Sequence, residues 1–237
     1  MKIFMCIDYD NLSSIQKESG ILNVAQRIIA SISNSIESKT GSCEIRLYGG
    51  WYEDDNLTQA SQQLSIAIQD AFPSIIRVQN KNDDVVKITT TAELALSLLE
   101  EPSHHLFNTF RKKRKPGNIK VVSQNSVGCN SNLCLIPLAK KLLKKGICPA
   151  VGCGSEGEQI IYRHEQKLVD TMLTCDLLYL SEHHNDVIVV VSSDDDFLPP
   201  IRSLLNKGKK IIRCHPKISI NSKPVIVGRR VLMEMEV

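Results

Sequence analysis

The sequence lacks the features that would mark it as anything but an ordinary folded protein. Aromatic residues make up only 5% of its 237 residues, and it has a single tryptophan. No apolar run approaches the ~20 residues that cross a bilayer, and the N-terminal segment reaches Asp8 too early for a secretion signal. With 42% hydrophobic and 23% charged residues, the composition excludes a disordered, collagen-like or coiled-coil chain. We expect a cytoplasmic protein with a sizeable core and no membrane partner.

Excess charge of one sign is also nearly absent, because 29 basic residues face 26 acidic ones and the formal net charge is +3. The exception is a block of five consecutive cations, Arg111, Lys112, Lys113, Arg114 and Lys115. Phe107 and Phe110 precede this block, so cations for phosphates and rings for base stacking are neighbours. That combination favours contact with single-stranded nucleic acid. The alternative is a solvated loop with a run of charge.

The period of the apolar residues predicts that strands and helices alternate along the chain. Strands are expected at residues 2–7, 43–51, 74–78, 85–90, 119–123, 186–191 and 210–213. Helices are expected at residues 21–36, 57–72, 133–145, 165–180 and 197–206. Because strand–helix–strand units cross over with one hand, this order predicts an α/β fold with a mostly parallel sheet and helices on both faces. No repeat or linker divides the chain, so we expect a single domain over residues 1–237, with an insertion around 100–160 that carries the basic block and a cysteine-rich element.

Acidic residues follow two of the expected strands. They are Asp8 and Asp10 after the first strand, and Asp194, Asp195 and Asp196 after the strand at 186–191. Asp170 lies near the start of an expected helix and can face the same edge of the sheet. In an open parallel sheet, sites form outside the carboxyl ends of the strands. We therefore expect these carboxylates to meet at one edge.

Carboxylates that meet repel one another unless a cation holds them ionised. Their hard oxygen atoms suit Mg²⁺ or Mn²⁺, which bind a few carboxylates together with phosphate oxygens. Such an ion can activate water and stabilise the charge of an in-line displacement at phosphorus. The pattern predicts phosphodiester hydrolysis, although each acid taken singly is also a common N-cap of a helix.

Three motifs, in this order, resemble the NYN family of PIN-like nucleases. They are Ile7-Asp8-Tyr9-Asp10-Asn11-Leu12, Lys167-Leu168-Val169-Asp170 and Val191-Ser192-Ser193-Asp194-Asp195-Asp196-Phe197-Leu198-Pro199. The resemblance implies a PIN-like, Rossmann-like sheet and cleavage of RNA, which many members of the family perform. It also implies that divalent metal is held by Asp8, Asp170, Asp194 and Asp196, with Asn11 and Ser192 as orienting groups.

The chain departs from the family pattern by carrying extra acids at Asp10 and Asp195, which leaves open which carboxylates touch the metal. If strand geometry persists, Asp194 and Asp196 point one way and Asp195 the other, so we expect the pair to be the ligands. The family resemblance also extends to Asp176, but this residue lies six positions after Asp170, about 120° away around a helix, so a structural cap or ion pair is as compatible with the sequence as a place in the acidic site.

Two cations precede Asp170 in the sequence. Lys167 and Arg163 lie three and seven residues before it, so on a helix they would share its face and could hold a phosphate near the metal. The alternative is a surface ion pair with Glu165 or Glu158.

The eight cysteines, in a chain without a secretion signal, predict thiols or metal ligands instead of disulfides. Four of them form two Cys-x4-Cys pairs, Cys129, Cys134, Cys148 and Cys153. Glycine and proline around the second pair favour a turn on which thiolates could hold structural zinc, although this spacing is wider than usual. The other four lie on apolar elements and are expected in the core: Cys6, Cys43, Cys175 and Cys214.

These patterns together predict a Mg²⁺- or Mn²⁺-dependent endoribonuclease that acts on single-stranded RNA. One alternative is a non-catalytic adaptor that binds nucleic acid or protein in the same pocket, which the retained acids disfavour. Another is a nuclease directed at DNA, because the same chemistry cuts either sugar. The oligomeric state stays open, a homodimer included.

Overall fold

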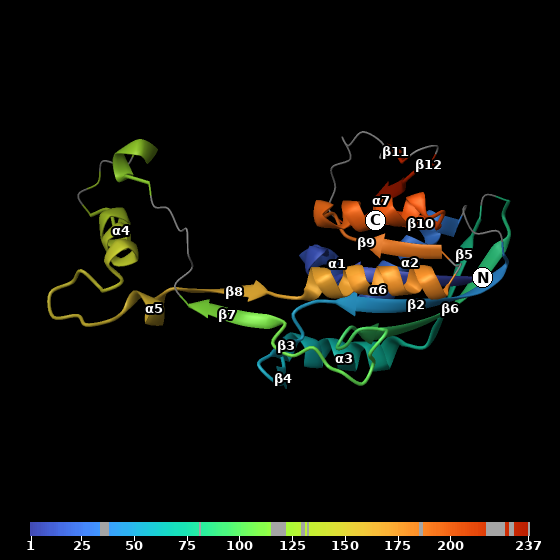
Figure 1. Ribbon diagram of the computed structural model, residues 1–237, viewed down its shortest axis with the longest axis horizontal. Helices are drawn as coiled ribbons and strands as arrows, with labels where there is room; N and C mark the ends of the chain where they lie inside the picture. Colours follow the sequence, from blue (N-terminus) through green and yellow to red (C-terminus); the bar gives the residue numbers. More distant parts are fainter. Residues whose placement is uncertain are drawn as a thin grey trace. The chain divides into compact units, whose positions relative to one another are not determined.

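The computed structural model describes residues 1–33, 38–80, 82–114, 122–128, 131, 133–184, 187–216, 226–227 and 230–236. It groups the chain into two compact units (Figure 1). The sheet unit comprises Met1–Phe110 and Gln166–Val237, and the central unit comprises Arg111–Glu165. The domain organisation that we expect from the sequence stays a prediction.

A seven-stranded sheet forms the middle of the sheet unit, in the order β13-β10-β9-β1-β2-β6-β5. The strands are β1 (Lys2–Asp8), β2 (Thr40–Tyr48), β5 (Ser74–Gln79), β6 (Val85–Leu94), β9 (Val187–Val191), β10 (Ile211–His215) and β13 (Met233–Glu236). Neighbouring strands pair in parallel except β5 with β6, which pair antiparallel. The mostly parallel α/β sheet is therefore confirmed, and its central strands have their carboxyl ends at one edge.

Helices cover both faces of this sheet, as the alternation predicts. One group is α1 (Ser14–Ser19), α2 (Ile21–Ile32) and α3 (Gln59–Ala71), and the other is α6 (Val169–His183) and α7 (Leu198–Asn206). Successive residues of β1 divide between the two cores, because side chains alternate along a strand. Ile3, Met5 and Ile7 pack with α2, whereas Phe4 and Cys6 pack with α6. A strand buried on both faces explains the unbroken apolar run at the start of the chain.

The sheet unit also contains several short elements. They are the turns η1 (Tyr9–Asn11) and η4 (Asp195–Phe197), and the strand pairs β3 (Tyr52–Glu53) with β4 (Asn56–Leu57) and β11 (Ile226–Val227) with β12 (Arg230–Val231). Both turns follow strands of the parallel sheet directly or after a few residues. No helix in the described ranges has the length and apolar character needed to cross a membrane.

The described part of the central unit holds a two-stranded ribbon and three short helical segments. The ribbon pairs β7 (Phe110–Arg114) with β8 (Tyr162–Gln166), and the helical segments are η3 (Gln124–Val127), α4 (Ile136–Lys145) and α5 (Gly157–Ile160). Helix α4 begins with Pro137 in its first turn, where a missing N–H costs nothing, and ends at Gly146 with φ 73°. Of the strand expected at 119–123, residues 119–121 lie outside the described residues.

The predicted helix at 165–180 is wrong at its start. Residues 162–166 form β8, and Leu168 has a φ of +68°, so α6 begins only at Val169. Arg163 and Lys167 therefore lie outside the helix, and the expectation that they share a helical face with Asp170 is also wrong. Asp170 itself occupies the first turn of α6, where a carboxylate complements the helix dipole.

Candidate active site at the carboxyl edge of the sheet

Two adjacent parallel strands bring Asp8 and Ser192 together. Ile7 of β1 pairs in register with Val191 of β9, so the residues that follow them are neighbours at the carboxyl edge. The buried Ser192 hydroxyl donates a hydrogen bond to Asp8 Oδ2 at 2.9 Å and accepts one from the Asp194 amide at 3.0 Å. One hydroxyl thus connects the first strand of the chain with the acidic loop after β9.

Asn11 makes a second connection across the same edge. Its side chain lies in the turn η1 and hydrogen-bonds to Asp8, and its Oδ1 accepts a hydrogen bond from the Ser193 amide at 3.1 Å. Asp8 is only 6% exposed, so these contacts hold its carboxylate in one orientation. Asn11 and Ser192 thus both contact the Asp8 carboxylate.

Arg213, a residue that sequence analysis missed, hydrogen-bonds to the acidic loop, which we define as Asp194–Asp196, and to Ser192 before it. Arg213 lies in β10 with a side chain 2% exposed. It donates hydrogen bonds to the Ser192 carbonyl at 3.1 Å and the Asp194 carbonyl at 2.7 Å, and one to Asp195 Oδ1 at 3.3 Å. An arginine within an apolar strand, next to a strand that ends in acids, was the signal that could have revealed it.

The three consecutive acids of the loop have different environments. Asp194 Oδ1 accepts a hydrogen bond from the Asp196 amide at 3.0 Å and caps η4, while Asp195 pairs with Arg213. The strand alternation assumed for these three acids is wrong, because residues 195–197 form a helical turn.

Burial and the charges of neighbouring acids raise the pKa values of Asp8 and Asp170. Burial raises the pKa of Asp8, the hydrogen bond from Ser192 opposes this increase, and the negative charge of Asp170 adds to it. Asp170 is exposed at the start of α6, yet partial desolvation and the charges of Asp194 and Asp196 raise its pKa as well. The four acids that the family resemblance implies as ligands are thus linked through electrostatic repulsion.

The donor chemistry of this set fits Mg²⁺ or Mn²⁺, which prefer hard oxygen ligands. In the part of the chain that is described, no three His, Cys, Asp or Glu side chains lie close enough to share one ion. Mg²⁺ usually keeps several waters and takes one or two protein carboxylates plus substrate phosphate oxygens. Asp8 and Asp170, with the acids of the loop beside them, can provide these one or two carboxylates.

Two further predicted site residues lie beside the acids. Asp10 is within 3.5 Å of Lys17 Nζ, and its charge contributes to the raised pKa of Asp8. Lys167 is exposed two residues before α6, and its backbone amide donates to the Thr109 carbonyl at 2.9 Å.

Asp176 has a structural role in the second core. It is 1% exposed and accepts hydrogen bonds from Arg46 Nε at 3.0 Å, the Tyr48 hydroxyl at 2.8 Å and the Leu99 amide at 2.9 Å. Of the two readings that the sequence leaves open, the structural ion pair is the one observed.

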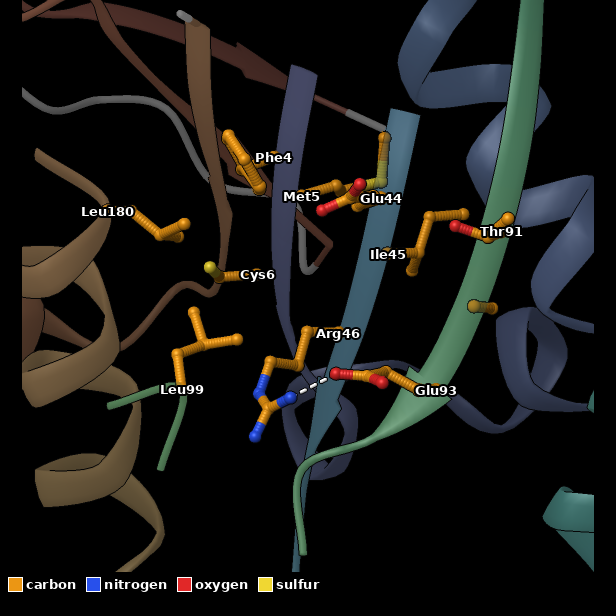
Figure 2. A pocket seen from close by; sticks show the side chains of 11 residues that line it. Phe4, Met5, Cys6, Glu44, Ile45, Arg46, Thr91, Glu93, Leu99 and Leu180 are labelled. Atoms are coloured by element: carbon orange, nitrogen blue, oxygen red, sulfur yellow. Dashed lines mark hydrogen bonds and ion pairs between the residues drawn. The ribbon is translucent and has the colours of Figure 1, made fainter. Parts of the chain in front are cut away.

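A cavity of about 330 Å³ lies along the face of the sheet, next to this ion pair (Figure 2). Its walls include Phe4, Cys6, Arg46, Glu93, Leu99 and Leu180. Arg46 forms an ion pair with Glu93 there, as Figure 2 shows. None of the four acids at the carboxyl edge lines the cavity, so it is separate from the candidate site.

Several aromatic contacts are described near the basic block. Phe107 packs on Tyr52, with ring centroids 4.9 Å apart, and Phe110 packs against Gly50. Lys112 Nζ lies 3.9 Å from the centroid of the Tyr162 ring. Lys115 lies outside the described residues, as do the side chains of Lys113 and Arg114.

Arg163 forms an ion pair with Glu165 at 3.1 Å. This is the contact that the sequence offers as an alternative to phosphate binding.

The cysteines divide into core residues and residues of the central unit. Cys6, Cys43 and Cys214 are buried as predicted, whereas Cys175 is exposed on α6, so its placement in the core is wrong. Hydrogen bonds with Ser155 and Cys148 lower the pKa of the Cys153 thiol. Cys134 is half-buried, and Cys129 lies outside the described residues. Two of the four proposed zinc ligands are thus in contact.

A comparison with known families agrees with the motifs. Residues 137–223 match the family model of the NYN domain, a family of PIN-like nucleases. The matched region contains Asp170, the acidic loop and Arg213, and the sheet brings Asp8 to it from outside that region. No curated protein and no solved structure matches the chain. The resemblance identified from the sequence is confirmed.

Proposed function

Since residues 137–223 of this chain match the family model of the NYN domain, we propose that the protein is a Mg²⁺- or Mn²⁺-dependent endoribonuclease acting on single-stranded RNA. The observation that carries the proposal is that the Ser192 hydroxyl hydrogen-bonds to both the Asp8 carboxylate and the Asp194 amide at the carboxyl edge of the parallel sheet, with Asp170 near enough for its charge to raise the pKa of Asp8. Asp8 comes from the first strand of the chain and the others from its last third, so only the fold brings them together.

Asp8, Asp170, Asp194 and Asp196 are the candidate ligands, of which one or two would bind the ion directly together with phosphate oxygens of the substrate. When bound, the ion would supply a water of lowered pKa and stabilise negative charge on the phosphate. The chain itself positions the ligands: Ser192 and Asn11 fix the buried Asp8 carboxylate, and Arg213 fixes the carbonyls of the loop. The reaction adds water across one P–O bond, and the leaving oxygen takes up a proton.

The energetic cost of the site supports a catalytic role over an adaptor role. Burying Asp8 and keeping Asp170 close to two more acids raises both pKa values, which means that the ionised site destabilises the folded chain. Groups perturbed in this way are concentrated at functional sites. An adaptor that needs no metal would gain stability by losing these acids.

The test is cleavage of a labelled single-stranded RNA by the full chain with Mg²⁺, Mn²⁺ or EDTA. We expect Asp8→Asn and Asp194→Asn each to reduce the cleavage rate by about 100-fold or more, because loss of a metal ligand removes several kcal/mol of transition-state stabilisation. Asp70→Asn, at an exposed position of α3, is the matched control and should cut at the wild-type rate. Unchanged cutting by both site variants would disprove the assignment.

The same assay separates the two alternative functions. A chain that binds the RNA in EDTA but never cuts it with either metal would be an adaptor. Competition between RNA and DNA oligonucleotides of one sequence identifies the preferred sugar, and preferential cutting of DNA would replace the ribonuclease proposal with a deoxyribonuclease.

A further inference from the structure

Positive charge is concentrated in the central unit. Residues 111–165 contain eleven Lys and Arg residues and three Glu residues, a formal net charge of +8. The rest of the chain has 18 basic and 23 acidic residues, a net charge of −5. The overall value of +3 therefore conceals two units of opposite sign. A unit of this charge attracts a polyanion, and phosphate contacts dominate the affinity of proteins for nucleic acids.

The ribbon of the central unit combines this charge with exposed rings. Strands β7 and β8 pair and run in opposite directions (Figure 1). The Tyr162 and His164 rings lie 5.4 Å apart, and Lys112 Nζ lies over the Tyr162 ring at 3.9 Å. All three side chains are exposed. We call them the ribbon face.

The two faces of β8 differ in chemistry. Tyr162 and His164 are two residues apart and share one face of the strand, whereas Arg163 between them points to the other face. Arg163 is bound to Glu165, which lies on that same other face, at 3.1 Å. Among the described side chains, the Lys112 ammonium and the Tyr162 and His164 rings are thus combined, while the other face of β8 carries the Arg163–Glu165 ion pair.

We propose that the ribbon face binds single-stranded RNA, with a base stacked on Tyr162 and His164 and Lys112 paired with a neighbouring phosphate. This inference rests on the proposed function for the identity of the nucleic acid, and it assigns a binding surface outside the acidic site. An exposed cation–π contact is weaker than base stacking, so a base can displace the Lys112 ammonium from the ring towards the phosphate. Single strands fit this surface because the bases of a duplex are stacked on one another.

Binding is measured on the full chain without added Mg²⁺ or Mn²⁺ and without a chelator, by fluorescence anisotropy of a labelled, unstructured RNA at several salt concentrations. Because no cleavage is needed, failure of the nuclease proposal and failure of this one are distinguishable. We expect Tyr162→Leu to weaken binding about tenfold through loss of stacking, and Tyr162→Phe to bind as wild type. Lys112→Gln should reduce the salt slope by about 0.7, the value for one phosphate contact of a single strand.

Two controls come from the sheet unit. Tyr179 and His183 form a stacked pair on α6 with centroids 4.2 Å apart, so Tyr179→Leu removes a similar ring from outside the central unit. Lys87→Gln removes an exposed cation of β6. Both should leave RNA affinity and salt slope unchanged.

Three results would overturn the proposal. They are wild-type affinity in Tyr162→Leu, equal loss in the Tyr179→Leu control, or tighter binding of duplex RNA than of single strands. Circular dichroism identifies a Tyr162→Leu variant that fails to fold, and in that case His164→Ala and Lys112→Gln decide by the same criteria.

Discussion

The Ser192 hydroxyl donates to the Asp8 carboxylate across 2.9 Å, although the two residues are 184 positions apart in the sequence. This contact exists because β1 and β9 are adjacent and in register. The same hydroxyl oxygen accepts a hydrogen bond from the Asp194 amide, so the orientation of Asp8 and the position of the acidic loop depend on one oxygen atom. The site can therefore be tested without removing any carboxylate.

We expect Ser192→Ala to reduce cleavage at least about tenfold and to lower the free energy of unfolding by about 1.5–3 kcal/mol, the usual contribution of a hydrogen bond to a charged group. The control is Ser181→Ala, which removes an equally buried hydroxyl that donates to the Leu178 carbonyl within α6. That variant should lose stability without losing activity per folded molecule. Chemical denaturation and initial rates measure the two quantities, and equal rates in both variants would contradict the role of Ser192.

Arg213 offers a second test, because its planar guanidinium reaches two loop carbonyls at once. Lysine keeps the charge but lacks this geometry. We expect Arg213→Lys to lower the free energy of unfolding by about 3 kcal/mol, since buried acceptors and Glu234 would lose their donor. The cleavage rate should also fall, because the hydrogen bonds that fix the Ser192 and Asp194 carbonyls are weakened.

The matched control for Arg213 is Asp195→Asn, which removes the exposed member of the same ion pair. The Asp195 side chain is 83% exposed, so this pair contributes little to stability. The free energy of unfolding of Asp195→Asn should remain within about 0.5 kcal/mol of the wild-type value. A loss as large as that of Arg213→Lys would show that the ion pair, and not the carbonyl contacts, holds the loop.

Asp170→Asn should make the metal-free protein more stable at neutral pH. The folded state raises the pKa of Asp170 above its ordinary value of 3.8, so folding favours the protonated form. Stability from this group is fully present below the ordinary pKa and is lost as the pH rises through the higher, folded pKa. Asparagine is neutral throughout and avoids that loss. Thermal unfolding in EDTA should show a higher Tm for the variant at pH 7 and a smaller difference at acidic pH.

Two comparisons complete this experiment. A ligand that binds the folded state raises the Tm more when its affinity is higher. Because Asp170→Asn lacks one candidate ligand, added Mg²⁺ should raise its Tm less than that of the wild type. Asp176→Asn should do the opposite of Asp170→Asn and lower the free energy of unfolding by about 3 kcal/mol, since it removes the buried carboxylate that accepts hydrogen bonds from Arg46, Tyr48 and the Leu99 amide. A lower Tm for Asp170→Asn in EDTA would contradict the electrostatic account of the site.

Elements with a strong apolar period could be predicted from the sequence. The stripe from Ile21 to Ile32 forms α2 and packs beneath β1, and the apolar run at 187–191 forms β9. The acidic edge followed from these two strands, because parallel strands necessarily end at the same edge. Local pattern and topology are enough for such features.

Features that depend on distant pairing could not be predicted in this way. Tyr162 and Arg163 lie in a strand because β7 pairs with them, and the preceding 50 residues give no local signal of that partner. Arg213 contacts loop carbonyls, which no side-chain motif encodes. Asp195 departs from Asp194 because a helical turn replaces the strand, a change that depends on the backbone and not on residue type.

The cysteines of the central unit give the last prediction. Cys148 and Cys153 are in contact, and a lowered thiol pKa at Cys153 favours the thiolate that zinc binds. Leu133, Leu135 and Val151 are exposed in the same unit, so its described part has little core to hold it together. A metal can supply this stability in a small unit. We expect the purified protein to contain zinc, and Cys148→Ser with Cys153→Ser to lose it and to make the central unit sensitive to protease, while Cys175→Ser on α6 retains it. Metal analysis and limited proteolysis measure both effects, and a zinc-free wild type that resists protease would contradict the prediction.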